Sequence, residues 1–170
     1  MTAAAGTGGD LGAVWQALAS IPDPEIPVIS ICDLGIVRDV RVDGVTLRVV
    51  VTPTYSGCPA MHAIEDEIRA CLADRGWGPV SIVTELAPPW TTDWMSPAAR
   101  DRLRAYGIAP PAPAASPAVV RFVTQRHAGP ACPRCGSGDT ELLSQFASTA
   151  CKALYRCLEC REPFDYFKPI

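Results

Sequence analysis

Long apolar runs are missing from this 170-residue sequence, and we expect no targeting segment among its residues. No stretch approaches the about 20 apolar residues needed to span a bilayer. Residues 1–10 are small, polar and Gly-rich, and no basic residue is followed by an apolar stretch, so we expect a disordered N-terminus and not a signal peptide. We therefore expect a cytoplasmic protein with no membrane partner. In such a reducing compartment the eight cysteines are better read as metal ligands or reactive thiols than as disulfides.

A strongly basic surface is also missing. The formal net charge is −3, with 8 Lys/Arg against 13 Asp/Glu in residues 1–118 and 7 against 5 in residues 119–170. Duplex nucleic acid owes much of its affinity for proteins to the neutralisation of phosphates by Lys and Arg. The charge therefore disfavours nucleic acid as a partner.

Histidine is scarce, and two cofactor signatures are missing. The chain has only His62 and His127, with no Glu-x-x-His motif of the kind that builds di-iron carboxylate sites in helix bundles. It also lacks a Gly-rich dinucleotide fingerprint. These absences exclude a di-iron oxygenase and a nicotinamide-dependent reductase.

The patterns that are present predict an α+β protein, in which helices pack on a short sheet and a tetracysteine zinc-ribbon module follows. Asp10 is suited to cap a first helix, and Ser96 followed by Pro97 to begin a third. We expect a first domain over residues 11–107, a Pro/Ala linker over 108–118 and the ribbon over 119–170. The expected helices span residues 11–20, 59–73 and 97–106, and the expected strands 36–42, 45–51, 80–86, 119–123, 142–146, 154–156 and 164–167.

The strongest chemical signal is a pair of C-x-x-C motifs, formed by Cys132 with Cys135 and by Cys157 with Cys160. Each pair can form a tight turn that points both thiolates at one ion, and four thiolates suit tetrahedral Zn²⁺ with no position left for a substrate. We expect a structural zinc that supplies much of the folding energy of this small module. Cys151 lies outside the spacing and is expected to be a spectator.

Soft thiolates accept several metals, so a single iron in the same four cysteines, as in rubredoxin-type electron carriers, is an alternative. Four aromatic side chains leave a second choice open, because they could stack on nucleic-acid bases or form the small core of the ribbon, which we favour. These residues are Tyr155, Phe164, Tyr166 and Phe167.

A single thiol, Cys58, stands at the predicted start of the second helix, after Gly57 and before Pro59. At a helix N-cap the unpaired N–H groups would stabilise a thiolate and lower its pKa, although a buried structural cysteine fits the local sequence equally well. His62 lies one turn further along and is more simply read as a surface residue. No base or oxyanion site accompanies Cys58, which disfavours a thiol enzyme.

Several longer motifs resemble known families. Asp23-Pro-Glu-Ile-Pro27, Asp33-Leu-Gly-Ile36 and Thr52-Pro-Thr-Tyr-Ser-Gly-Cys-Pro59 resemble the small α+β family that serves iron–sulfur cluster assembly, which includes SufT-like proteins. Pro88-Pro-Trp-Thr-Thr-Asp-Trp-Met95, Tyr106-Gly-Ile-Ala-Pro-Pro111 and the C-terminal segment from Ser148 resemble the PaaD (PaaJ) subunits of bacterial phenylacetate degradation.

This resemblance implies an accessory or maturation subunit of the phenylacetyl-CoA epoxidase system, a monooxygenase with a di-iron oxygenase, a structural partner and an iron–sulfur flavoprotein reductase. It also implies that Cys58 holds iron or an iron–sulfur cluster transiently, that residues 11–107 form the assembly-type domain, and that the other epoxidase subunits are partners. The acidic residues Asp23, Glu25 and Asp93 are expected to support Cys58. We expect the subunit to be non-catalytic, and a cluster shared between two Cys58 thiols would require a homodimer.

Overall fold

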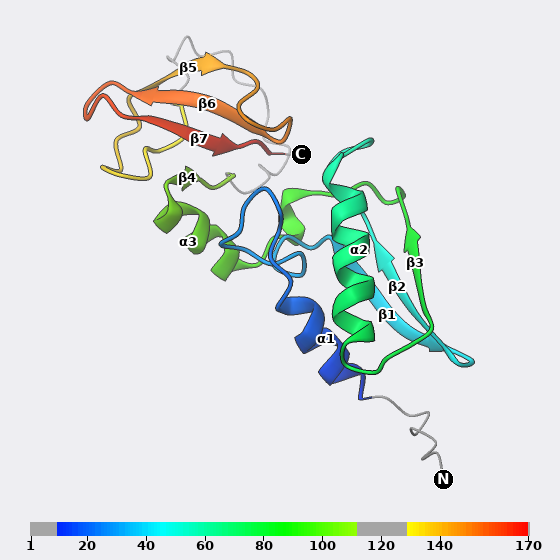
Figure 1. Ribbon diagram of the computed structural model, residues 1–170. Helices are drawn as coiled ribbons and strands as arrows, with labels where there is room; N and C mark the ends of the chain where they lie inside the picture. Colours follow the sequence, from blue (N-terminus) through cyan, green and yellow to red (C-terminus); the bar gives the residue numbers. More distant parts are fainter. Residues whose placement is uncertain (1–9, 112–128, 170) are drawn as a thin grey trace. The chain divides into compact units, whose positions relative to one another are not determined.

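The computed structural model describes residues 10–111 and 129–169, and the chain divides into two compact units, residues 1–90 and 91–170 (Figure 1). Each unit is considered by itself. The division falls at Trp90, whereas the sequence suggested a boundary after residue 107. The indole Nε1 of Trp90 donates a hydrogen bond to the Leu34 carbonyl at 3.0 Å, which fixes this buried side chain within the first unit.

The first unit contains two helices and a three-stranded sheet, close to the sequence prediction. The Asp10 carboxylate caps α1 by accepting the Gly12 N–H at 2.9 Å. Asp43 pairs with Thr46, so the hairpin turn is Gly44-Val45, one residue later than expected, with Gly44 at a φ of 62°. The elements are α1 (Leu11–Ala19), β1 (Val37–Asp43), β2 (Thr46–Val51), α2 (Ala60–Ala73) and β3 (Val80–Thr84).

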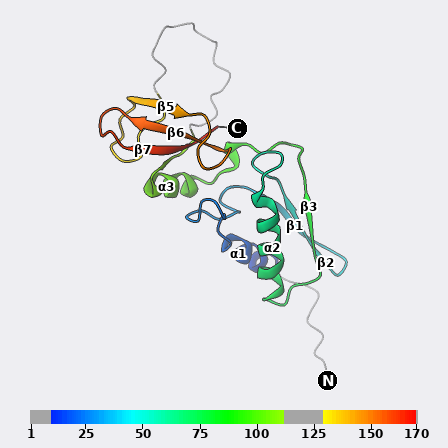
Figure 2. The same cartoon turned by 45° about the horizontal axis from the view of Figure 1, so that its top comes forward.

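The sheet has the order β1-β2-β3, with an antiparallel first pair and a parallel second pair. Figures 1 and 2 show α1 and α2 side by side, and α1 also contacts β1 while α2 contacts β3. The apolar stripe of α2 is buried at Ile64, Ile68, Cys71 and Leu72, as the helical spacing predicted. This packing fixes α2 in the first unit, and the Cys58 loop leads directly into its N-terminus.

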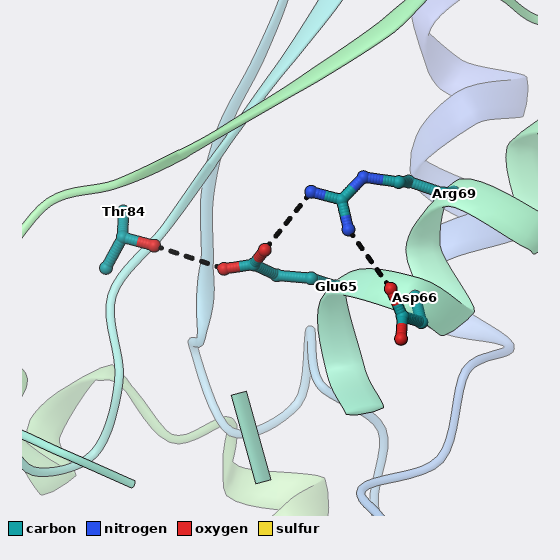
Figure 3. Close-up of polar contacts among 4 residues, drawn as sticks. All are labelled: Glu65, Asp66, Arg69 and Thr84. Atoms are coloured by element: carbon teal, nitrogen blue, oxygen red, sulfur yellow. Dashed lines mark hydrogen bonds and ion pairs between the residues drawn. The ribbon is translucent and has the colours of Figure 1, made fainter. Parts of the chain in front are cut away.

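A polar network on the surface links α2 to the edge strand β3 (Figure 3). The Thr84 hydroxyl donates to the Glu65 carboxylate at 3.4 Å, and the same carboxylate receives the Arg69 guanidinium at 3.1 Å. Arg69 also bonds Asp66 at 3.3 Å. These side chains are mostly solvent-exposed, so we assign the network a small contribution to stability.

The second unit begins with segments that the sequence did not assign to the ribbon. Its elements are a short 3-10 helix η1 (Thr92–Trp94), α3 (Pro97–Tyr106), β4 (Ile108–Ala109), β5 (Thr140–Ser144), β6 (Lys152–Cys157) and β7 (Pro163–Phe167). The sheet order is β4-β7-β6-β5. Ile108 and Ala109, expected to open the linker, instead pair in parallel with Asp165 and Tyr166 of β7.

Arg100 of α3 ties together the segments on the two sides of β4. Its guanidinium donates to the Thr92 carbonyl at 2.7 Å and to the Pro111 carbonyl at 2.9 Å. Helix α3 begins as predicted, because the Ser96 hydroxyl accepts the Ala99 N–H at 3.1 Å and Pro97 occupies the first turn.

Three sequence predictions lie wholly or mostly outside the described residues: the disordered N-terminus at 1–10, the strand at 119–123 and the linker at 108–118. His127 lies outside them as well. Among the helices of the described residues, none is long and apolar enough to cross a membrane.

Candidate functional site

The two C-x-x-C motifs converge in the second unit. The ligand atoms of Cys132, Cys135, Cys157 and Cys160 all lie within 4.8 Å of one another. The Cys132 and Cys160 sulfurs are 3.7 Å apart, and the Cys135 and Cys157 sulfurs are 3.5 Å apart. The predicted cluster is therefore confirmed as a geometric arrangement of four sulfur atoms.

The cluster fits a tetrahedral metal. A Zn–S bond of about 2.3 Å in a regular tetrahedron separates neighbouring sulfurs by about 3.8 Å, and both sulfur–sulfur separations are close to this value. When bound there, zinc would supply structural cross-linking, since four protein ligands leave no position for a substrate.

The two C-x-x-C motifs have the same backbone hydrogen bond and the same backbone conformation. The N–H of the first cysteine in each motif donates to a carbonyl five residues on, from Cys132 to Ser137 at 2.8 Å and from Cys157 to Glu162 at 3.0 Å. The residue after the second cysteine is left-handed in both, with φ of 77° at Gly136 and 66° at Arg161. Arg161 thus adopts a conformation that glycine accepts more easily.

Backbone N–H groups point at three of the sulfurs. Donation from the Cys160 N–H, helped by hydrogen bonds with the Cys135 thiol and the Glu159 N–H, outweighs burial and lowers the pKa of Cys157 to about 7. The Ser137 and Glu162 N–H groups bond Cys135 and Cys160 and act to lower the pKa of each, but burial and neighbouring cysteine thiols outweigh them, so the pKa of Cys135 is raised and that of Cys160 is raised to about 12. Hydrogen bonds of this kind orient metal ligands and stabilise the charge of thiolates.

The cluster is half inside the ribbon. Cys132 and Cys157 are buried, whereas Cys135 and Cys160 are exposed. The buried pair belongs to a small core with Ala109 and Phe164, against which Tyr155 and Tyr166 pack. The Tyr155 ring lies 6.0 Å from that of Phe164 and 5.6 Å from that of Tyr166, so these aromatic residues form the core of the ribbon, as favoured from the sequence.

Cys58 lies in the first unit, directly before α2. The N-cap is Pro59, so Cys58 is one residue outside the helix, and its carbonyl accepts the Met61 N–H at 3.2 Å. Gly57, at a φ of 81°, turns the chain sharply before the thiol, and an added Cβ there would meet no atom within 4 Å. The side chain is half-buried.

The acidic loop approaches this thiol. The buried Asp23 accepts the N–H groups of Glu25 and Ile26, each at 2.9 Å, while its own N–H donates to the Ile29 carbonyl at 2.8 Å. Glu25 is fixed by this turn, and the charges of Glu25 and Asp23 both act on Cys58. The charges of Asp23 and Glu25 therefore reach Cys58, although both residues lie far from it in the sequence.

The helix-terminus argument predicted a lowered pKa for the Cys58 thiol, and this prediction was wrong. Burial raises the pKa of this thiol above its ordinary value, and the carboxylates of Glu25 and Asp23 raise it further. The Ala60 N–H and the Tyr55 side chain donate to the sulfur and lower the pKa, but they do not compensate. Sequence reasoning missed Tyr55, although its position three residues before Cys58 in the same turn was a usable signal.

The other candidate residues have separate roles. Asp33 closes its own turn by accepting from the Ser30 hydroxyl at 2.8 Å, and Asp93 belongs to η1 in the second unit. His62 is exposed, as expected from the sequence.

Cys151 is buried outside the cluster, with its sulfur 3.0 Å from the Thr149 hydroxyl. Cys32 is half-buried, and burial followed by the charge of Asp33 raises its pKa to about 12.

The two units correspond to two known domain families. Residues 12–83 match the family described as iron-sulfur cluster assembly protein, and residues 116–168 match the PaaD zinc beta ribbon domain. The crystal structure of a domain of unknown function, DUF59, from Bacillus anthracis covers 54% of this chain and 89% of its own, with 26% identity and a TM-score of 0.51. The site and fold thus define an assembly-type domain joined to a zinc ribbon.

Relatives extend this match to the whole chain. A protein of Escherichia coli strain K12, provisionally named as a subunit of 1,2-phenylacetyl-CoA epoxidase, is 54% identical over 92% of both chains. The Fe-S protein maturation auxiliary factor YitW of Bacillus subtilis strain 168 is 41% identical over 49% of this chain and 82% of its own. The chain belongs to the PaaD family of phenylacetyl-CoA epoxidase subunits.

Proposed function

We propose that this chain is a non-catalytic accessory subunit of the phenylacetyl-CoA epoxidase system, which holds iron or an iron–sulfur cluster as cargo at Cys58. Family membership supports the link to the epoxidase, and the match of residues 12–83 supports the assembly role. The observation that carries the assignment of the site is the half-buried Cys58 thiol directly before α2, on which the charges of Glu25 and Asp23 act.

Weak, reversible binding is what this arrangement favours. The thiol is mostly protonated near neutral pH because its pKa is raised, so a cation must displace a proton to gain the sulfur ligand. The two carboxylates favour the approach of that cation by Coulomb attraction. A soft sulfur beside hard oxygens also suits ferrous iron better than it suits metals that demand sulfur alone. Cargo can therefore enter and leave under mild conditions.

The ribbon has the opposite role in this proposal. We assign a resident structural zinc to its four cysteines, because a closed four-sulfur site suits permanent binding better than transfer. The metal then helps to fold the second unit, whose common core includes two of the ligands, Cys132 and Cys157.

The test compares two half-buried thiols of the same unit. The epoxidase is produced together with the wild-type chain, the Cys58→Ser variant or the Cys32→Ser variant, and its iron content and activity are measured. We expect Cys58→Ser to lower both, while Cys32→Ser and the zinc content of either variant match the wild type. Normal maturation of the epoxidase with Cys58→Ser would refute the proposal.

The four-sulfur geometry also suits a single iron, which would make the ribbon an electron carrier. The purified chain distinguishes the two. An iron-loaded ribbon is coloured and reversibly reducible, whereas a colourless protein with one zinc per chain removes the electron-carrier alternative.

A further inference from the structure

Residues 92–111 form a helix–strand segment that is closed on itself by Arg100 of α3. The Arg100 guanidinium donates to the carbonyl of Thr92, at the start of this segment, and to that of Pro111, at its end. Helix α3 passes into β4 through Gly107 alone, whose left-handed φ of 98° turns the chain between the two elements. We call residues 92–111 the α3 strap.

The α3 strap contains little structure that could persist without the ribbon. Helix α3 has 10 residues, and isolated helices shorter than about 12–15 residues are marginal in water. Strand β4 has two residues, Ile108 and Ala109, which are a strand because they pair with β7. Among the described helices and strands, α3 contacts β4 and β4 contacts β7, so β4 links the helix to the ribbon (Figure 1). The order of the strap therefore depends on the order of β7.

Ala109 connects the strap to the metal site. This residue is 1% exposed and belongs to the small core that includes the ligands Cys132 and Cys157. Its register partner on β7, Tyr166, packs against the same core. A bound metal fixes the two cysteines, and small ribbons take much of their folding energy from the metal. Zinc therefore stabilises the surface on which Ala109 is packed.

We propose that the α3 strap is a metal-dependent connection between the two units, docked on β7 while the four cysteines hold zinc and released when the metal leaves. In the docked state the strap belongs to the second unit, and the boundary between the units lies between Trp90 and Thr91. In the released state residues 91–111 add roughly 70 Å of fully extended chain to the connection. The metal state of the ribbon thus sets the length of chain that joins it to the assembly-type domain.

This proposal rests on the resident zinc of the proposed function, and it does not depend on cargo at Cys58. A chain that carries zinc but whose strap ignores the metal contradicts this proposal alone. Normal epoxidase maturation by Cys58→Ser contradicts the cargo site alone. The two failures are therefore distinguishable.

Hydrogen exchange of the full-length chain tests the release, with zinc bound and after removal of the metal by a chelator. We expect α3 to lose its protection together with β6 and β7, while β1 to β3 keep theirs. Trypsin should then cleave after Arg102 or Arg104 of α3 at least about tenfold faster than in the zinc-loaded chain. Protection of α3 that persists without the metal would overturn the proposal.

Linkage requires the reverse effect as well, because a change that loosens the strap must weaken zinc binding. Arg100→Ala removes both hydrogen bonds that close the strap and leaves every cysteine in place. We expect it to weaken zinc affinity by about three- to tenfold, measured by competition with a chromogenic chelator. Saturating zinc should still give one zinc per chain in this variant, which shows that its ribbon folds.

Arg104→Ala is the matched control for this measurement. It removes a second arginine of the same helix, one that makes an exposed ion pair with Asp101 at 3.0 Å. Its zinc affinity should stay within about twofold of the wild type, because exposed ion pairs contribute little. Equal zinc affinities for the wild type and Arg100→Ala would overturn the coupling between strap and metal, as would an equal loss in both variants.

Discussion

The four ligand sulfurs of the ribbon lie within 4.8 Å of one another, whereas Cys58 is bonded by Tyr55 and is acted on by the charges of two carboxylates. The same side chain is thus placed in two opposite environments. In the ribbon, hydrogen bonds lower the pKa of Cys157 to about 7, burial and neighbouring thiols raise that of Cys160 to about 12, and the four sulfurs complete a closed set of ligands. At Cys58, burial and negative charge raise the pKa. In our proposal, the surroundings of the thiol, more than the residue type, separate a permanent metal site from a transient one.

The largest expected effect follows from opening the closed site. Cys157→Ser removes one of four ligands and should abolish stoichiometric zinc binding. The ribbon should then also lose stability, because a bound metal supplies much of the folding energy of a small ribbon. Metal analysis and hydrogen exchange should show loss of zinc and of protection in β6 and β7, while β1 to β3 keep their protection. Full zinc content in this variant would break the distinction between the two environments.

A smaller effect on stability should distinguish the two C-x-x-C motifs, because one is followed by Gly136 and the other by Arg161. Gly136→Ala places a side chain at a φ of 77° without any steric contact and should destabilise the zinc-loaded ribbon by roughly 1 kcal/mol. Arg161→Gly should stabilise the ribbon by a similar amount, because it relieves the left-handed backbone at a φ of 66°.

Thermal unfolding with zinc bound measures both changes, and Arg161→Ala serves as a control that keeps the backbone restriction. Shifts of the same sign in Gly136→Ala and Arg161→Gly would show that the two halves are not equivalent.

The smallest effect concerns the thiol of Cys58. Glu25→Gln removes a charge that raises its pKa, so the pKa should fall, and the rate of alkylation at pH about 8 should rise a few-fold. Tyr55→Phe removes a donor that lowers the pKa, so the pKa should rise and the rate at the same pH should fall.

Rates measured across pH with a soluble alkylating agent check both directions, and the rate at high pH should change little in either variant. Identical profiles for the wild type and Glu25→Gln would remove the acidic loop from the account of Cys58.

Local signals predicted much of the fold. The Ser96-Pro97 start placed α3 within its observed bounds, and the apolar spacing of α2 identified its buried face. The spacing of the four ribbon cysteines was sufficient to predict their convergence. These features depend on residues close in sequence, or on a motif whose geometry is nearly fixed.

Features that depend on distant partners were missed. Ile108 and Ala109 lie in a Pro/Ala-rich segment, and only their pairing with Asp165 and Tyr166 makes them a strand. Whether the pKa of Cys58 is raised or lowered depends on burial and on the charges of a loop more than thirty residues earlier in the chain. The helix-terminus argument considered only local dipoles, which these tertiary effects outweigh.

Metal analysis with a visible absorption spectrum tests the central claim most directly, on protein purified without oxygen as the wild type, Cys58→Ser and Cys157→Ser. The account predicts one zinc per chain in the wild type and Cys58→Ser, and loss of that zinc in Cys157→Ser. It also predicts iron, or an iron–thiolate absorption band, that disappears in Cys58→Ser. Iron that persists in Cys58→Ser and disappears with Cys157→Ser would place the exchangeable metal in the ribbon and contradict the account.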